Sequence, residues 1–102
     1  MGKEIVPSIV WNKDALKSFQ KIYTYILEDS YSNAEKVRLG ILKIISTIPN
    51  QPTKFGLDQY KKTNLGNFRY FEKYSLRIAF KHTETEIRIL RIRHVKQEPK
   101  SF

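Results

Sequence analysis

The chain lacks cysteine altogether and has only two histidines among its 102 residues. The absence of cysteine excludes disulfides, thiolate metal ligands and a cysteine nucleophile. The histidines, His82 and His94, are too few for a histidine-rich metal centre. No repeat, linker or low-complexity segment is present, and glycine and proline number four each. We therefore expect one folded unit that needs no metal and no cofactor.

The chain also lacks a long hydrophobic run. The apolar stretch from Met1 to Trp11 contains Lys3, Glu4 and Pro7, and it is too short for a signal sequence or a membrane span. The composition, 40% hydrophobic and 13% aromatic, is typical of a globular protein. The length predicts a single domain over residues 1–102, soluble and cytoplasmic, with no membrane partner.

Charge is plentiful and unevenly distributed. Lysine and arginine total 19 against 10 acidic residues, a net charge of +9. Residues 1–53 carry seven basic and five acidic side chains, a net +2, whereas residues 54–102 carry twelve and five, a net +7. Such a field favours an anionic partner: nucleic acid, a ribonucleoprotein surface or an acidic protein segment. The alternative is a charged surface that only keeps the protein soluble.

Apolar residues spaced three and four apart predict two amphipathic helices. The first begins near Lys13, with Asn12 as its N-cap, and the second ends at Ile48, before a proline. Ser32 and Glu35 have the spacing of a capping box at the start of the second helix. The short connection predicts an antiparallel hairpin, and Gly40 is expected at a close crossing of the two helices.

Alternating apolar and polar residues predict four strands around this hairpin. Tight turns at Tyr74 and at residues 83–85 join the last three into an antiparallel meander, and residues 51–66 are expected to form a loop. The predicted fold is α+β, in the order β-α-α-β-β-β, with the helical hairpin packed on one face of an antiparallel sheet. The expected strands are Ile5–Trp11, Asn67–Lys73, Ser75–His82 and Glu86–His94.

The last strand has a predicted division of faces. Strict alternation places Leu90 and Ile92 on the same face as His94. The opposite face would carry Ile87, Ile89, Arg91 and Arg93. Because a helical hairpin covers only one face of a sheet, the uncovered face is expected to present cations.

Six cations of the C-terminal half form the predicted binding set for an anionic ligand or target. Arginine forks bind phosphate oxygens with two-point geometry, which suits several arginines on one face. The alternative is pairing with nearby acids, Arg69 with Glu72 and Arg88 with Glu86, and for Arg88 that alternative is favoured. Asp58 and Glu72 are otherwise interpreted as solvated acids. The predicted set is Lys54, Lys61, Lys62, Arg69, Arg91 and Arg93.

Catalysis by this set would involve His94. Neighbouring cations favour its neutral imidazole, which could accept the proton of an RNA 2′-hydroxyl while Arg69, Arg91 and Arg93 stabilise the charged phosphate. The alternative is a histidine with a structural hydrogen bond only. The sequence has no glycine-rich phosphate loop and no serine–histidine–aspartate set. Some aromatic residues of this half could stack on bases.

The order and spacing of several segments resemble the RelE/ParE family of small bacterial toxins over nearly the whole chain. The resemblance implies a β-α-α-β-β-β fold, growth arrest by the free toxin, and an acidic antitoxin as partner. The segments that carry it are Trp11 with Ala15, Ile22–Ile26, Ile48–Pro49, Gly66–Arg69, Arg77–Phe80 and Ile89–Pro99.

The resemblance leaves two mechanisms open. RelE-like toxins cleave mRNA on the ribosome without a metal, and ParE-like toxins poison DNA gyrase and are not nucleases. Nuclease members often have a tyrosine soon after the last strand, whereas here Val95 follows His94 and the chain ends in Phe102. The ending with Gln97 and Pro99 is more similar to ParE-like chains. Further alternatives are a non-toxic nucleic-acid-binding module and an inactive homologue that only binds an antitoxin. No small-molecule substrate is expected.

Overall fold

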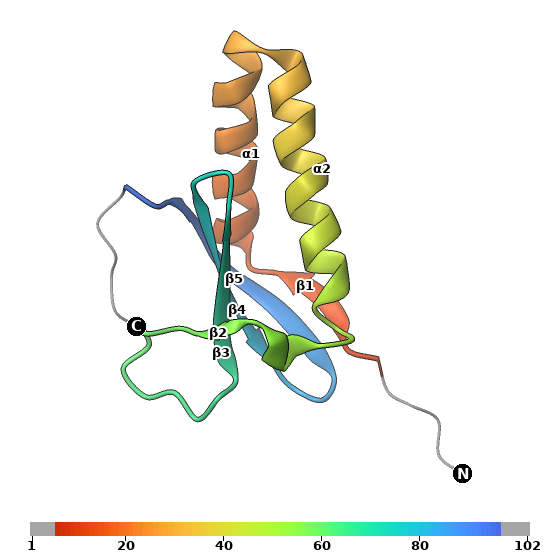
Figure 1. Ribbon diagram of the computed structural model, residues 1–102, viewed down its shortest axis with the longest axis vertical. Helices are drawn as coiled ribbons and strands as arrows, with labels where there is room; N and C mark the ends of the chain where they lie inside the picture. Colours follow the sequence, from red (N-terminus) through yellow and green to blue (C-terminus); the bar gives the residue numbers. More distant parts are fainter. Residues whose placement is uncertain (1–5, 97–102) are drawn as a thin grey trace.

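The computed structural model describes residues 6–96. Two long helices stand against one face of a sheet and extend well beyond it (Figure 1). The predicted order of helices and main strands is confirmed, and a two-residue strand, β2, is added within the predicted loop. Ile5, the predicted start of the first strand, lies outside the described residues. The elements are β1 (Ser8–Trp11), α1 (Lys13–Asp29), α2 (Tyr31–Thr47), a 3-10 turn η1 (Pro52–Lys54), β2 (Gly56–Leu57), β3 (Phe68–Lys73), β4 (Leu76–His82) and β5 (Glu86–His94).

The five strands form one mixed sheet in the order β1-β5-β4-β3-β2. The predicted meander is confirmed, because β3, β4 and β5 pair antiparallel, and β2 adds antiparallel to β3. The prediction of an antiparallel sheet is wrong for β1, which runs parallel to β5 with Ser8 opposite Glu86 and Trp11 opposite Ile89. No hairpin turn joins these two strands. The direction of β1 is therefore set by the helical hairpin that follows it, which acts as a crossover.

The first helix begins where the sequence predicts, but its cap differs. Asn12 occupies the N-cap position without a side-chain capping bond. Its Oδ1 instead accepts a hydrogen bond of 3.0 Å from Nη1 of Arg88 on β5. The asparagine therefore ties the start of α1 to the sheet rather than to the helix's own amides.

The second helix begins earlier than the sequence predicts, because its cap is Ser30. The Ser30 Oγ accepts a hydrogen bond from the amide of Asn33 at 3.1 Å. The same residue closes α1, since its amide donates to the carbonyl of Ile26 at 2.9 Å. The predicted capping box of Ser32 and Glu35 is therefore wrong. Ser30 is the cap in place of Ser32 because it ends the first helix and caps the second.

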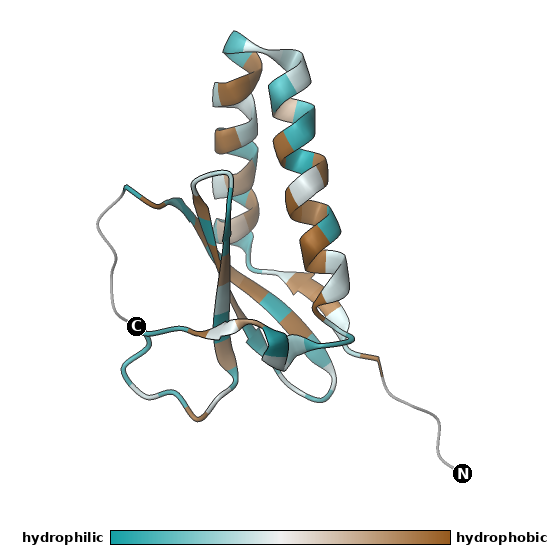
Figure 2. Ribbon diagram, viewed as in Figure 1, coloured by the Kyte–Doolittle hydropathy of each residue, from teal (hydrophilic) through white to brown (hydrophobic). Residues whose placement is uncertain are grey.

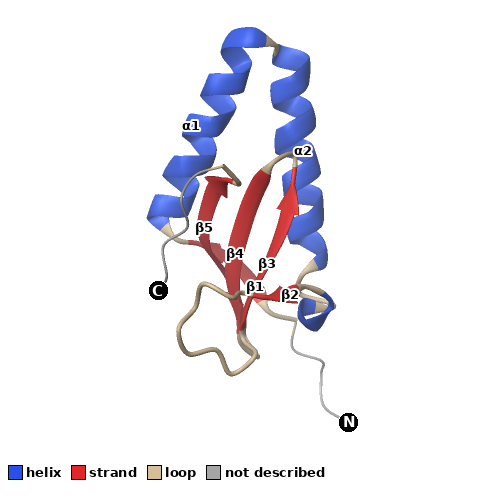
Figure 3. Cartoon of the chain, turned by 60° about the vertical axis from the view of Figure 1, so that its left-hand side comes forward, coloured by secondary structure: helices blue, strands red, loops and turns tan. Residues whose placement is uncertain are grey.

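The core lies between the helical hairpin and one face of the sheet (Figure 3). Hydrophobic residues recur along both helices and the strands, whereas the loop after β2 is mainly hydrophilic (Figure 2). Phe80 has no exposed surface, and the Phe55 ring meets its edge at a centroid distance of 5.5 Å. Burying one such large apolar side chain contributes roughly 1.5–3 kcal/mol. Within residues 6–96, no helix is long and apolar enough to cross a membrane.

Gly40 is a point of close approach, but not between the helices. A Cβ added to Gly40 would lie 2.6 Å from both Cε2 and Oη of Tyr74. Tyr74 stands in the β3–β4 turn, where Tyr74 and Ser75 both have positive φ, 54° and 61°. The predicted helix–helix crossing at Gly40 is therefore wrong. The glycine lets the tip of the sheet hairpin lie against α2.

We expect the effect of Gly40→Ala to depend on Tyr74. In a Tyr74→Ala background, Gly40→Ala should raise the free energy of unfolding by about 1 kcal/mol, because alanine is the better helix former. With Tyr74 present, the added methyl group must displace the ring, so the gain should shrink or reverse. Urea unfolding of the wild type, both single variants and the double variant measures this coupling. Equal gains in the two backgrounds would contradict it.

The outer parts of the two helices are joined by a polar network. The Tyr23 hydroxyl donates a hydrogen bond to Glu35, which also pairs with Arg38 through Nη2 and Oε1 at 2.8 Å. The bonds from Arg38 and then Tyr23 hold the pKa of the Glu35 carboxyl below its ordinary value. The bond to Glu35 also raises the pKa of the Tyr23 hydroxyl. Glu35, which the sequence predicts as a cap, thus connects α1 to α2.

This network predicts an acid-sensitive contribution to stability. A lowered folded pKa means that Glu35 stabilises the fold fully above its unfolded pKa of about 4.3. The contribution is lost as the pH falls through the lowered folded value. The stability difference between the wild type and Glu35→Gln should therefore be largest near neutral pH, vanish in strong acid, and shrink at high salt. Urea unfolding across pH tests this, and a difference that grows on acidification would contradict it.

Candidate functional site

The face of the sheet turned away from the helices carries the charged residues of the candidate site. We call this surface the open face. Its loop margin comes from residues 58–66, which follow β2. Register and alternation place on it Phe68, Tyr70 and Glu72 of β3, Arg77, Ala79 and Lys81 of β4, and Glu86, Arg88, Arg91 and Arg93 of β5.

A buried ion pair fixes the loop to the open face. Nη2 of Arg77 lies 3.1 Å from Oδ1 of Asp58, and the two side chains are only 6% and 2% exposed. Nη1 of Arg77 lies 3.3 Å from Oε2 of the half-exposed Glu72. The interpretation of Asp58 as a solvated acid is therefore wrong. Glu72, the suggested partner of Arg69, pairs with Arg77 instead.

Two tyrosine rings enclose the same guanidinium. The Arg77 Cζ lies 3.6 Å from the ring centroid of Tyr70 and 4.7 Å from that of Tyr60. The Tyr60 ring also approaches Arg93, at 5.5 Å. The amide of Tyr60 donates to Oδ1 of Asp58 at 3.0 Å, so the loop acid positions the ring that covers the arginine. Cation–π contacts of this kind strengthen as water is excluded.

A β-bulge in β5 changes the predicted division of faces. Ala79 pairs with Arg91 and Phe80 with Ile89, which leaves Leu90 as an extra residue in β5. The bulge turns Arg91 and Arg93 to the open face while Ile89 stays in the core. The predicted sharing of one face by Ile87, Ile89 and the two arginines is therefore wrong. A single inserted residue reverses the alternation, which strict periodicity cannot reveal.

Arg69 lies on the opposite face, at the helix side of the sheet, where it pairs in register with Phe80. Its Nε donates to the carbonyl of Gly66 at 2.9 Å, and its Nη1 donates to the carbonyl of Phe55 at 2.7 Å. Thr53 supplies a further carbonyl at 3.3 Å. Arg69 thus closes the ends of the long loop onto β3, away from Arg91 and Arg93.

His94 also lies on the helix side, because it pairs in register with Leu76 of the core. Its Nδ1 accepts a hydrogen bond from the amide of Lys96 at 3.1 Å. The structure therefore does not bring the four predicted catalytic residues together. Arg91 and Arg93 share the open face, while Arg69 and His94 lie across the sheet from them.

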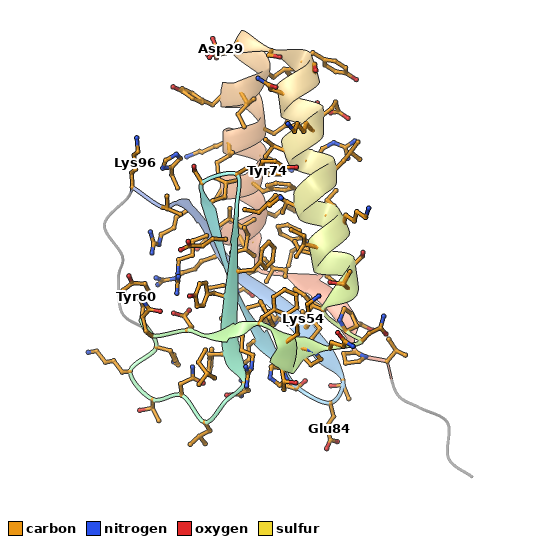
Figure 4. All side chains as sticks on the ribbon, viewed as in Figure 1. Asp29, Lys54, Tyr60, Tyr74, Glu84 and Lys96 are labelled. Atoms are coloured by element: carbon orange, nitrogen blue, oxygen red, sulfur yellow. The ribbon has the colours of Figure 1, made fainter. Side chains whose placement is uncertain are left out.

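The three predicted lysines do not all lie at the same part of the sheet. Lys61 lies over the ring of Phe68 on the open face at 4.5 Å, and Lys62 is exposed in the same loop. Lys54 is exposed in η1, and Figure 4 shows it at the other end of β2 from Tyr60. The prediction that Arg88 pairs with Glu86 is confirmed, with Nε and Oε2 2.9 Å apart. No group of three potential metal ligands occurs among residues 6–96.

A groove of about 810 Å³ lies between α1 and the β3–β4 turn. Its floor is largely apolar, from Ile22, Ile26 and Leu76, and Lys21 and Lys96 stand in its lining with His94. Within the described part of the chain, residues 6–96, no acidic side chain lines it. An anionic segment with an apolar side fits this combination best.

Sequence reasoning missed the residues that build the open face, chiefly Asp58, Tyr60, Tyr70 and Arg77. One signal was available, since Arg77 interrupts the apolar run from Leu76 to Phe80. An arginine in such a run must find a partner if the strand is buried on both faces. The partner could not be found by spacing, because Asp58 is 19 residues earlier in the chain.

Solved structures share this fold. A chain from the chromosomal ParDE toxin–antitoxin system of P. aeruginosa matches with a TM-score of 0.65 at 20% identity, covering 87% of this chain and 96% of that chain. The YoeB dimer from Staphylococcus aureus matches at 0.54 and 14% identity, covering 87% and 97%. At such identities the likeness concerns the fold alone. No curated protein sequence matches the chain.

The fold is therefore one that occurs in a ParDE toxin–antitoxin system and in YoeB. The family model for the ParE toxin of the type II toxin–antitoxin system parDE matches residues 9–99. The chain belongs to this ParE toxin family, which confirms the resemblance to RelE/ParE toxins. A toxin of such a system implies an antitoxin as its partner.

The buried ion pair gives a stability prediction. Asp58→Ala should lower the free energy of unfolding by about 3 kcal/mol, because it leaves the Arg77 guanidinium buried without its main partner. Glu72→Ala is the matched control. It removes the half-exposed partner of the same arginine and should cost less than about 1 kcal/mol. Urea unfolding compares the two, and equal losses would contradict the central role of Asp58.

Proposed function

We propose that this toxin arrests growth by binding DNA gyrase and that it does not cleave RNA. The observation that carries the proposal is the separation of the nuclease set. Arg91 and Arg93 lie on one face of the sheet, and His94 lies on the other. A general base must come within hydrogen-bond reach of the proton that it abstracts while the cations hold the phosphate. Membership of the ParE family also supports gyrase binding without RNA cleavage.

The hydrogen bonds of Arg69 add support. Two of its nitrogens already donate to three loop carbonyls, those of Thr53, Phe55 and Gly66. An arginine used in this way holds the loop in place and is poorly suited to clamp a substrate phosphate. We propose Lys61, Arg91 and Arg93 as contacts to the target, with exposed Lys54 and Lys62 at the margin.

We propose an acidic antitoxin segment as the inhibitor, bound in the groove between α1 and the β3–β4 turn. The apolar floor of Ile22, Ile26 and Leu76 suits an amphipathic segment, and Lys21 and Lys96 suit its acidic flank. Because this groove lies on the helix side, the antitoxin would keep a large target away by bulk rather than by covering the open face.

The test of the proposed function compares two reactions of the purified toxin. We expect inhibition of DNA supercoiling by gyrase and no cleavage of labelled mRNA in a coupled translation reaction with ribosomes. Arg91→Gln with Arg93→Gln should weaken gyrase inhibition, and His94→Ala should leave it unchanged. The mRNA assay is repeated with Arg69→Ala and His94→Ala.

Ribosome-dependent cuts that vanish in both Arg69→Ala and His94→Ala would overturn the proposal and assign the toxin to the nuclease branch. Growth arrest without either activity would point to another target. Absence of growth arrest, with the antitoxin still bound, would identify an inactive homologue.

A further inference from the structure

The open face, which supplies the proposed contacts to the target, is strongly cationic. With the loop margin included, it carries seven cations and three acids among the described residues. Among residues 6–96, Asp58 and Glu72 bind Arg77, and Glu86 binds Arg88. Counted over residues 6–96, the face therefore has a net charge of +4. The cations are Lys61, Lys62, Arg77, Lys81, Arg88, Arg91 and Arg93.

Aromatic rings hold several of these cations in place. Nζ of Lys61 and Nζ of Lys81 lie 4.5 Å and 5.4 Å from the centroid of the same ring, that of Phe68. Arg93 lies against Tyr60 at 5.5 Å. Long basic side chains lose rotamer entropy when a ligand fixes them. Rings that order them in advance lower that cost and favour a regular polyanion.

Apolar side chains distinguish between two polyanions. Among residues 6–96, the exposed large hydrophobic residues lie on the helices, in loops or at strand positions of the helix side. Leu65 lies on the loop margin, and none occupies a strand position of the open face. A protein segment binds chiefly through buried apolar and aromatic anchors. A nucleic acid backbone needs only cations and hydrogen-bond donors. The open face therefore fits a nucleic acid better than an acidic peptide.

We propose that the open face binds the phosphodiester backbone of DNA, through Arg91 and Arg93 with Lys61 and Lys81 beside them. This inference rests on the proposed function, because gyrase supplies DNA at the place where the toxin acts. The bulge at Leu90 is what makes the surface continuous, since it places Arg91 and Arg93 on the same face as Lys81 and Arg88. Contacts of this kind are independent of base sequence.

The experiment measures binding of the free, full-length toxin to a short labelled DNA duplex by fluorescence anisotropy over a range of salt concentrations. Arg91→Gln with Arg93→Gln should weaken binding by about tenfold and make the slope of log affinity against log salt shallower by about 1.8. Lys36→Gln with Lys43→Gln is the matched control. It removes the same charge from exposed positions of α2, and affinity should change by no more than about twofold. Circular dichroism checks that all variants are folded.

Equal weakening by the two pairs of substitutions would overturn the proposal, because net charge alone would then explain binding. Tighter binding of an acidic peptide than of DNA would also overturn it and would assign the open face to a protein. Labelled single-stranded DNA and RNA of the same sequence distinguish the source of the backbone, and a preference for RNA would overturn DNA as the ligand. Gyrase is absent from this assay, so its failure is separate from failure of the proposed function.

Discussion

The arrangement of the site depends on one buried ion pair, between Arg77 in the middle of β4 and Asp58 in the loop after β2. A guanidinium at this position would be strongly unfavourable without an acid, and the nearest acids must therefore come from other segments. Asp58 provides the charge from the loop and Glu72 adds a weaker contact from β3. The loop is consequently drawn onto the sheet, and it brings Tyr60 into position between two arginines.

A second arginine completes the attachment of the loop from the other side of the sheet. Arg69 binds carbonyls at both ends of the segment from Thr53 to Gly66. His82 adds a bond of 3.1 Å between its Nε2 and the same Gly66 carbonyl. Two arginines that a charge count would assign to ligand binding thus serve the architecture. Arg91 and Arg93, by contrast, lie with Arg88 on the β5 part of the open face.

Periodicity predicted the helices and the meander well, because each depends on local spacing and short turns. It failed where the deciding partner is distant in the chain. The parallel pairing of β1 follows from the path of the whole hairpin, and Asp58 finds Arg77 only after the sheet has formed. Leu90 shows a different limit. This one bulged residue changes the face on which Arg91 and Arg93 lie relative to Ile87 and Ile89, and nothing in the composition indicates the bulge. The cap of the second helix was predicted two residues too late, because Ser30 and not Ser32 is its N-cap.

The joint between the helices restricts how this chain can change in length. Only Ser30 separates α1 from α2, and it serves both helices at once. Each residue of an α-helix turns the next by about 100°. An insertion or deletion on either side of this serine would rotate one helix about its axis and carry its apolar stripe away from the sheet. Related chains should therefore keep the length of the hairpin constant and place their insertions in the loop between β2 and β3.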